Sequence, residues 1–149
     1  MIIVMVIAAG LYVLFMWPSW SDPNRDLYKA WADFGVDCLP NGHANLSQHI
    51  HQKLTIVVDG QSVELPANIG IARNCLAEVH THDSTGTIHV ESVLAVKNFS
   101  LGQFFQVWGQ PFEREGYNLE MTMSGAKSRE LDKLVLKDGQ VIELKYSKK

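Results

Sequence analysis

The sequence predicts an α+β fold: a β-grasp-like, mostly antiparallel sheet with one central helix, preceded by an N-terminal transmembrane helix. Residues 48–65 and 75–92 alternate apolar and polar side chains around turn residues, which is typical of β-hairpins. Residues 98–112 have the apolar spacing of one helix, and residues 118–146 return to strand patterns. Strands, one helix and strands again favour an α+β sandwich.

Composition limits the classes of function. With 149 residues, of which 46% are hydrophobic, the chain has room for one domain of ordinary size. The net charge of -3 and the pI near 6.0 give no electrostatic footprint for nucleic acid, which we therefore exclude as a partner.

The first 17 residues, MIIVMVIAAGLYVLFMW, contain no charged side chain. As a helix they span roughly 25 Å, and extension to Trp20 gives about the length that a membrane span needs. Trp17 and Trp20 then lie where interfacial aromatic residues are expected. No basic region precedes the segment and no clear small-x-small site follows it. An uncleaved anchor over residues 1–20 is therefore favoured over a cleaved signal peptide or a buried core helix.

Residues 21–37 are predicted to form an amphipathic helix or linker between the anchor and a His-rich, β-rich domain over residues 38–149. Gly35 is a suitable C-terminal stop for this helix. The apolar side chains at helical spacing are Leu27, Ala30, Trp31 and Phe34. We expect this stripe to serve packing rather than ligand binding.

Two signals disagree on which side of the membrane the domain lies. Arg25 and Lys29 follow the apolar segment, and a positive-inside count places the domain in the cytoplasm. Cys38 and Cys75, the only cysteines, suit one disulfide in an oxidising compartment. Such a bond would stabilise the fold by about 3 to 4 kcal/mol in the chain-entropy model. Two separate buried thiols are the alternative.

An Asp59–Gly60 turn predicts a two-residue hairpin in HIHQKLTIVVDGQSVELP. In this register Val58 faces Gln61, and two further pairs follow. These are Ile56 with Val63 and Leu54 with Leu65. Strand alternation then places the aliphatic side chains on the core face, with His49 and His51 on the opposite face.

A second hairpin is predicted in CLAEVHTHDSTGTIHVES, where a turn at DSTG joins residues 75–82 to residues 87–92. A four-residue loop puts His80 opposite His89, and a two-residue loop puts His82 there. Because the two registers differ by an even step, His80, His82 and His89 share one face in both. Cys75 then points to the core face, with Val79, Ile88 and Val90.

The shared face predicts a metal site formed by His80, His82 and His89, completed by His49 or His51 if the hairpins adjoin. A merely polar face is the alternative. Imidazoles without thiolate suit copper(II) or zinc, with copper slightly favoured because no free thiol accompanies the H-x-H pairs. Acceptors expected to orient the rings are Glu78, Asp83 and Glu91. His43 lies outside both strands and is expected not to be a ligand.

In NFSLGQFFQVWGQPF, Ser100 and Gln103 match a capping box, and Gly109 followed by Pro111 ends the helix. Its apolar face, expected to be core, is Leu101, Phe104, Phe105 and Trp108. The segments NLEMTMSG and LVLKDGQVIELKY predict two or three more strands, with a turn at Asp138–Gly139.

The series HIHQKL, LPANIGI, CLAEVHTHDSTGTIHVES and SLGQFFQVWGQP resembles a family of largely uncharacterised exported or membrane-anchored bacterial and archaeal proteins. The resemblance covers about residues 38–146 and is most specific at HTHD and GTIHVES. It implies a fused anchor, an extracytoplasmic domain and no assigned activity. It also implies matching histidines at His49, His51, His80, His82 and His89.

Two zinc-hydrolase patterns fail on spacing. The metallo-β-lactamase pattern H-x-H-x-D-H needs Asp and His where Ser84 and Thr85 stand. The pattern of zinc-dependent deubiquitinases begins at HTH but finds Val90 and Val93 at its Ser and Asp positions. A zinc-dependent hydrolase is therefore only the third interpretation, and catalysis is not favoured.

The interpretation that fits the sequence best is a membrane-anchored, extracytoplasmic protein that binds copper or zinc through a histidine cluster. Its role would be metal handling or support of a membrane metalloenzyme. Its predicted partners are the membrane, through the N-terminal helix, and a membrane protein. The alternative is a metal-free interaction module with a polar histidine surface.

Overall fold

The computed structural model describes residues 24–149, so the predicted anchor over residues 1–20 lies outside the described residues. Within them, no helix is long and apolar enough to cross a membrane. The described helices are α2 (Arg25–Asp33), α3 (Leu101–Trp108) and the short 3-10 turn η1 (Leu131–Lys133). The described strands are β1 (Gln48–Val58), β2 (Gln61–Val63), β3 (Ile71–Ala72), β4 (Cys75–Leu76), β5 (Val79–His80), β6 (Thr87–Ser92), β7 (Tyr117–Met123), β8 (Ala126–Ser128) and β9 (Val141–Lys148).

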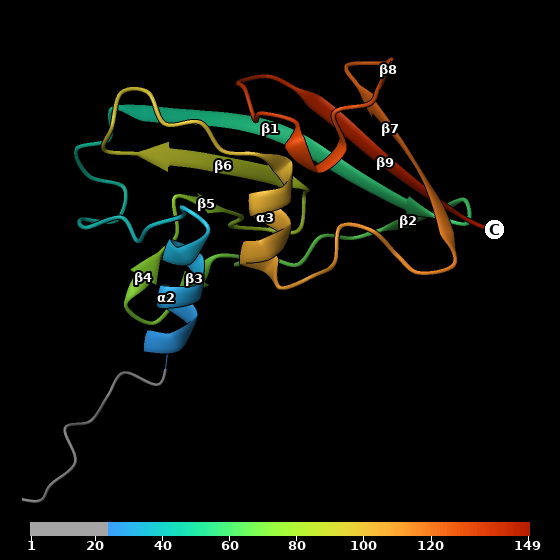
Figure 1. Cartoon of the computed structure of the whole chain (residues 1–149). Coiled ribbons are helices and arrows are strands. Elements are labelled where there is room, and N and C mark those ends of the chain that lie inside the picture. The colour runs from blue at the N-terminus through green and yellow to red at the C-terminus, as the bar shows by residue number, and fades with distance from the viewer. Residues whose placement is uncertain (1–23) are drawn as a thin grey trace, which may run out of the picture.

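The strands form a curled seven-stranded sheet in the order β5-β6-β1-β9-β7-β8, with β2 also paired to β1. Every pairing in this sheet is antiparallel except that of β1 with β9, which is parallel. Figure 1 shows α2, α3 and the small β3–β4 pair on one side of the sheet. The α+β class and the mostly antiparallel sheet are thus confirmed, whereas the β-grasp-like arrangement stays a prediction.

The helix α2 packs against the rest of the domain, so the predicted helix or linker over residues 21–37 is in part a packed helix. Trp31 is buried and belongs to the same core as the sheet residues, and Gly35 follows the helix with a φ of 84°. The backbone carbonyl of Phe34 accepts a hydrogen bond from Gln103 Nε2 of α3 at 2.8 Å. Two members of the predicted apolar stripe are exceptions, because Ala30 is exposed and Leu27 is 41% exposed.

The Asp59–Gly60 hairpin forms with the predicted register for two of its three pairs. Val58 pairs with Gln61 and Ile56 pairs with Val63. The third pair, of Leu54 with Leu65, is not part of the ladder. The Leu54 N–H instead donates to the carbonyl of Gly86 at 2.8 Å, because the turn before β6 occupies that edge of β1.

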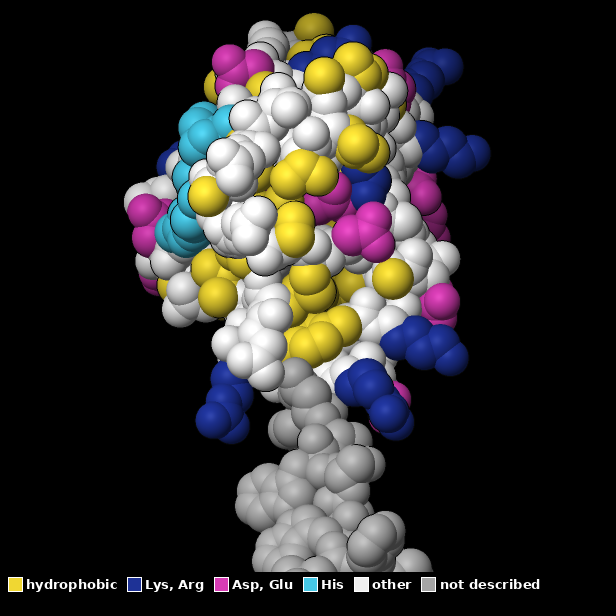
Figure 2. Space-filling view, turned by 90° about the vertical axis from the view of Figure 1, so that its left-hand side faces the viewer, with side chains coloured by type: hydrophobic (Ala, Val, Ile, Leu, Met, Phe, Trp, Pro, Cys, Tyr) yellow, Lys and Arg dark blue, Asp and Glu magenta, His cyan; other side chains and the backbone are white. Residues whose placement is uncertain are grey.

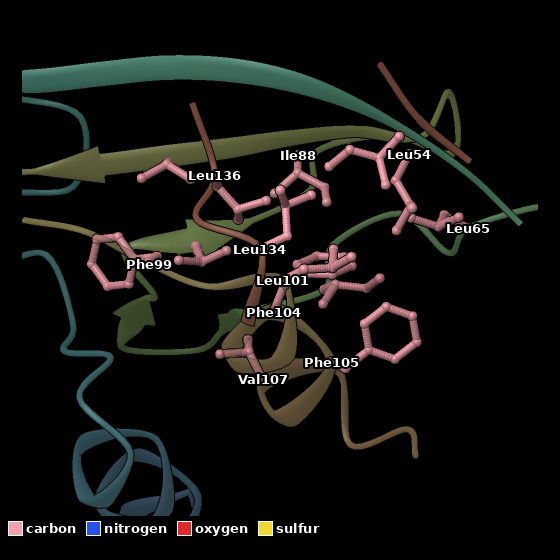
Figure 3. Packing of buried hydrophobic residues seen from close by; sticks show 14 of the residues in the cluster. Leu54, Leu65, Ile88, Phe99, Leu101, Phe104, Phe105, Val107, Leu134 and Leu136 are labelled. Carbon is pink, nitrogen blue, oxygen red and sulfur yellow. The ribbon is translucent and has the colours of Figure 1, made fainter. Parts of the chain in front are cut away.

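The core lies between the sheet and α3. The capping box is present, because Ser100 Oγ accepts from the Gln103 N–H and Gln103 Oε1 accepts from the Ser100 N–H. Leu101, Phe104 and Phe105 are buried beneath sheet residues such as Ile88 (Figure 3). Gly109 ends the helix in the left-handed conformation, as predicted.

The C-terminal segment differs from the prediction at residues 134–136. This stretch forms only an isolated bridge, between Val135 and Ser100, and no strand hairpin forms around Asp138–Gly139. The reason is that both edges of β9 are already paired, with β1 and with β7. Leu134 and Leu136 nevertheless remain core residues.

Gly86 fixes the turn that brings β6 alongside β1. Its φ is +84°, and an added Cβ would overlap the carbonyl oxygen of Leu54. Gly86→Ala is therefore expected to lower the free energy of unfolding by about 1 to 3 kcal/mol, from left-handed strain and steric overlap. Urea denaturation measures the change. Gly125→Ala is the matched control, since its φ of +85° is similar but no atom lies within 4 Å of the added Cβ. Equal losses in both variants would contradict the steric part of this prediction.

Candidate metal centre

The strands that carry His80 (β5), His89 (β6) and the pair His49 and His51 (β1) are neighbours at one edge of the sheet, and His82 follows β5. The order β5-β6-β1 places His80 opposite His89, and His89 opposite His51. His49 lies opposite Glu91 in the same ladder. The sequence did not decide whether the two hairpins adjoin. In the structure they do, because β1 pairs directly with β6. Figure 2 shows the histidine side chains gathered at one side of the molecule.

The predicted trio of His80, His82 and His89 comes together. Ring centroids are 4.7 Å apart for His80 and His82, 4.6 Å for His82 and His89, and 5.3 Å for His80 and His89. Both histidines of β1 join them, with His51 4.5 Å and His49 6.1 Å from the His89 ring. The residues on the other face, Val79, Ile88 and Val90, are fully buried in the core.

His43 corrects the prediction that it would stand apart from the cluster. Its ring lies 5.1 Å from that of His82 and 5.7 Å from that of His80, and its Nδ1 lies 2.7 Å from Glu91 Oε2. The loop that carries it is fixed at both ends, because the Leu39 N–H donates to Leu76 O and the Ser47 N–H donates to Ser92 O.

A sequence signal for this placement exists in the spacing of the cysteines. His43 follows Cys38 by the same five positions by which His80 follows Cys75. The predicted disulfide is present in the structure, with a Cα–Cα distance of 5.2 Å. Because the disulfide joins Cys38 to Cys75, His43 and His80 each lie five residues from the same covalent link.

The donor atoms fall into two groups. The first group is His43, His80, His82 and Glu91, and the second group is His49, His51 and His89. Within each group, one ligand atom per residue lies within 4.8 Å of all the others. Both cysteines are in the disulfide, so the described donors are imidazole and carboxylate only, a set that suits copper(II) or zinc.

Glu91 is a buried carboxylate whose ion-pair partners in the described structure are histidines. Its side chain is 1% exposed, and Oε1 lies 3.1 Å from His49 Nε2 and 3.9 Å from His80 Nε2. Within residues 24–149, Oε1 accepts no hydrogen bond. Burying a charge without a compensating cation costs several kcal/mol. A divalent ion would supply the missing positive charge.

The geometry around His80 fixes which nitrogen can bind a metal. Its ring is fully buried, and Nδ1–H donates to the carbonyl of Ala77 at 2.8 Å. Nε2 therefore carries the lone pair, and it lies 3.1 Å from His82 Nε2. A backbone acceptor that orients a ring in this way is typical of histidines that ligate metals.

Two of the rings are held neutral. Burial lowers the pKa of His80 to about 3, against an opposing contribution from the Ala77 hydrogen bond, and the positive forms of His82 and His89 lower it further. Burial likewise lowers the pKa of His89 to about 4, followed by the effects of His82 and His51. Neutral imidazole is the form that coordinates metals.

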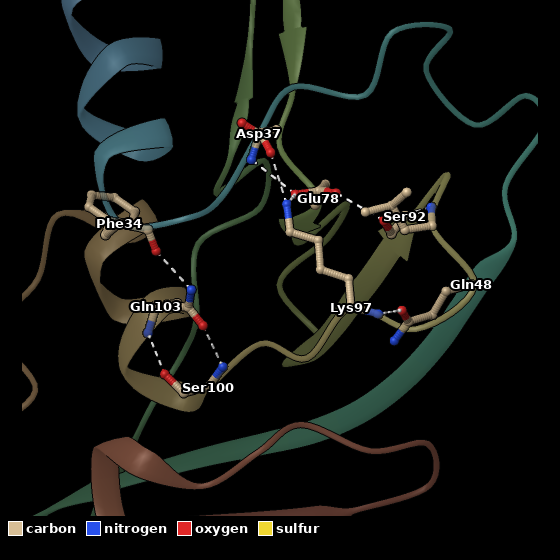
Figure 4. Close-up of polar contacts among 9 residues, drawn as sticks. Phe34, Asp37, Gln48, Glu78, Ser92, Lys97, Ser100 and Gln103 are labelled. Carbon is tan, nitrogen blue, oxygen red and sulfur yellow. Dashed lines mark hydrogen bonds and ion pairs between the residues drawn. The ribbon is translucent and has the colours of Figure 1, made fainter.

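The three predicted acceptors are placed differently from one another. Glu91 contacts histidine rings, as described above. Glu78 instead accepts hydrogen bonds from the Asp37 N–H and the Ser92 hydroxyl, and it forms an ion pair with Lys97 (Figure 4). Because β5 spans only Val79–His80, strand alternation does not extend back to residue 78.

Asp83 is occupied by its own turn. Its Oδ1 accepts hydrogen bonds from the N–H and the hydroxyl of Thr85, and these bonds lower the pKa of Asp83. The hydrogen bonds of this carboxylate are thus made within the loop between β5 and β6. Its contribution to the centre is to fix the turn that sets His80 opposite His89.

No family model, curated protein or solved structure matches this chain. The family resemblance carried by the HTHD and GTIHVES motifs therefore stays a prediction, as do the anchor and its orientation. What remains firm is the geometry, which brings six imidazoles and one buried carboxylate together at one edge of the sheet.

Proposed function

We propose that this protein is a membrane-anchored, extracytoplasmic metal-binding protein that holds copper(II) or zinc in its histidine cluster. Its role is metal handling or support of a membrane metalloenzyme. The observation that carries the proposal is the buried Glu91 carboxylate, whose ion-pair contacts in the described residues are with His43, His49 and His80. A bound divalent ion would balance this carboxylate and accept the lone pairs around it.

The donor set supports the choice of metals. Imidazole nitrogens suit copper(II) and zinc, whereas magnesium and calcium prefer shells of oxygen alone. The engagement of Cys38 and Cys75 in a disulfide leaves the centre without thiolate, which is the donor that favours copper(I). Extracytoplasmic placement is in keeping with the disulfide, and attachment to the membrane follows from the apolar segment MIIVMVIAAGLYVLFMW.

The test is metal analysis of protein purified without a His tag, followed by titration calorimetry with Cu(II) and with Zn(II). We expect His82→Ala to weaken binding at least tenfold, about 1.4 kcal/mol, while the fold persists because that side chain is exposed. Gln61→Ala is the control and should bind like the parent, because Gln61 is an exposed polar residue of β2, opposite the last residue of β1.

Two results would count against the proposal. A parent protein that binds neither metal would leave the histidines as a polar docking surface and would favour the interaction-module interpretation. Equal affinity in His82→Ala and Gln61→Ala would show that the ions bind elsewhere on the chain.

A further inference from the structure

We infer that the cluster binds two ions, one in each donor group, and that the Glu91 carboxylate bridges them. The inference rests on the proposed metal-binding function. It adds the number of ions, the ligands of each and a difference between them in access to solvent.

Ring orientation separates His80 of the first group from His89 of the second. The lone pair of an imidazole nitrogen lies in the plane of its ring, so a bound ion lies close to that plane. The rings of His80 and His89 are stacked with an interplanar angle of 11°. Two stacked, nearly parallel planes do not meet at any nearby point, so one ion cannot bind both rings well.

Within each group, ring planes cross instead of stacking, as they also do for His82 and His89, whose interplanar angle is 74°. The interplanar angle is 76° for His80 and His82 in the first group, and 85° for His51 and His89 in the second. Crossing planes allow lone pairs to converge on one point. Two donors of one ion, each about 2.1 Å from it, lie at most about 4.2 Å apart, which is close to the 4.8 Å limit within each group.

Glu91 contacts histidines of both groups. Oε2 is 2.7 Å from His43 Nδ1 of the first group, and Oε1 is 3.1 Å from His49 Nε2 of the second and 3.9 Å from His80 Nε2 of the first. A carboxylate that presents its two oxygens in this way can bind two ions, and paired ions in proteins are typically about 3.5 to 4 Å apart. The pairing of β1 with β6 sets this position, because Glu91 is directly opposite His49.

The two ions would differ in exposure. The first group includes the fully buried His80 and Glu91, whereas the second consists of the exposed His49 and His51 and the half-buried His89. The second ion has three imidazole ligands and one oxygen of the bridging Glu91, and the exposure of His49 and His51 leaves its remaining side open to water or to a donor from another molecule. We therefore infer that the ion in the first group is retained, and that the ion in the second group exchanges with a metal donor or acceptor.

The experiment counts copper in tag-free protein loaded with Cu(II) alone and freed of excess by gel filtration. Elemental analysis of the parent should give two ions per chain, and electron paramagnetic resonance should show magnetic coupling between them. His51→Ala should fall to one ion with an uncoupled spectrum, because only two imidazoles remain in the second group. Gln61→Ala should keep two coupled ions.

Glu91→Gln tests the bridge, since it keeps the side-chain volume and removes the charge, and it should abolish the coupling. If circular dichroism shows that this variant is unfolded, His49→Ala replaces it. That change removes an exposed ring beside Oε1 and should also lower the count to one.

The outcomes separate the two claims. A parent with no copper overturns the proposed function itself. A parent with one ion overturns the pair but leaves metal binding in place. Two ions whose spectra are uncoupled in the parent, and unchanged in Glu91→Gln, overturn the bridge.

Discussion

Replacing Cys38 and Cys75 together by serine is expected to lower the free energy of unfolding by about 3 to 4 kcal/mol. The disulfide closes a loop with a sequence separation of 37 residues, and its loss returns that loop's entropy to the unfolded chain. Chemical denaturation of parent and double variant measures the difference. Ser62→Ala and Ser84→Ala together, at two exposed positions, form the control and should change stability by less than about 0.5 kcal/mol.

The same variant should affect the two donor groups unequally. The bond ties the loop that carries His43 to the segment that leads into β5, so its loss removes the covalent constraint between ligands of the first group. His49, His51 and His89 lie on the paired strands β1 and β6 and keep their positions. A double variant that is as stable as the parent would show that the two segments are held by other contacts, such as the bridge of Cys38 with Ala77.

Phe104→Ala is expected to lower the free energy of unfolding by about 3 to 5 kcal/mol, because it leaves a cavity where a large side chain is fully buried. Phe104 lies on the core side of α3 and contacts the rings of Phe105 and Trp108. Urea titration followed by circular dichroism checks the value.

Gln106→Ala is the matched control for this change. It lies on the exposed side of the same helix and should change stability by no more than about 0.5 kcal/mol. A Phe104→Ala variant that loses no more stability than Gln106→Ala would contradict the packing described for this core.

The sequence pattern correctly predicted features that depend on contacts between residues close together in the chain. The capping box of Ser100 and Gln103 and the turn at Asp59–Gly60 both depend on residues within a few positions, and both are present. Parity placed His80, His82 and His89 together because alternation along a strand is the same in any even register.

The remaining features depend on contacts that local pattern does not contain. The predicted strand over residues 75–82 divides into β4 and β5, because Ala77 is bridged to Cys38 and its N–H donates to Gly70 O. Glu78 forms an ion pair with Lys97 and accepts a hydrogen bond from the Asp37 N–H instead of contacting the histidines, and both partners are distant in sequence. His43 was missed because its position is set by a loop and a disulfide and not by strand alternation.

The parallel pairing of β1 with β9 has a consequence for the order in which the centre can form. Lys53 pairs with Val141, so the strand that carries His49 and His51 gains one of its neighbours only when a much later part of the chain is available. Pairings of such high sequence separation slow folding, because the loop must close before the contact stabilises anything. All six histidines, however, lie between residues 43 and 89. During synthesis the complete set of imidazoles, together with the strands β1, β5 and β6 that arrange them, therefore exists before β9, and an ion that arrives early meets a sheet that β9 has not yet completed.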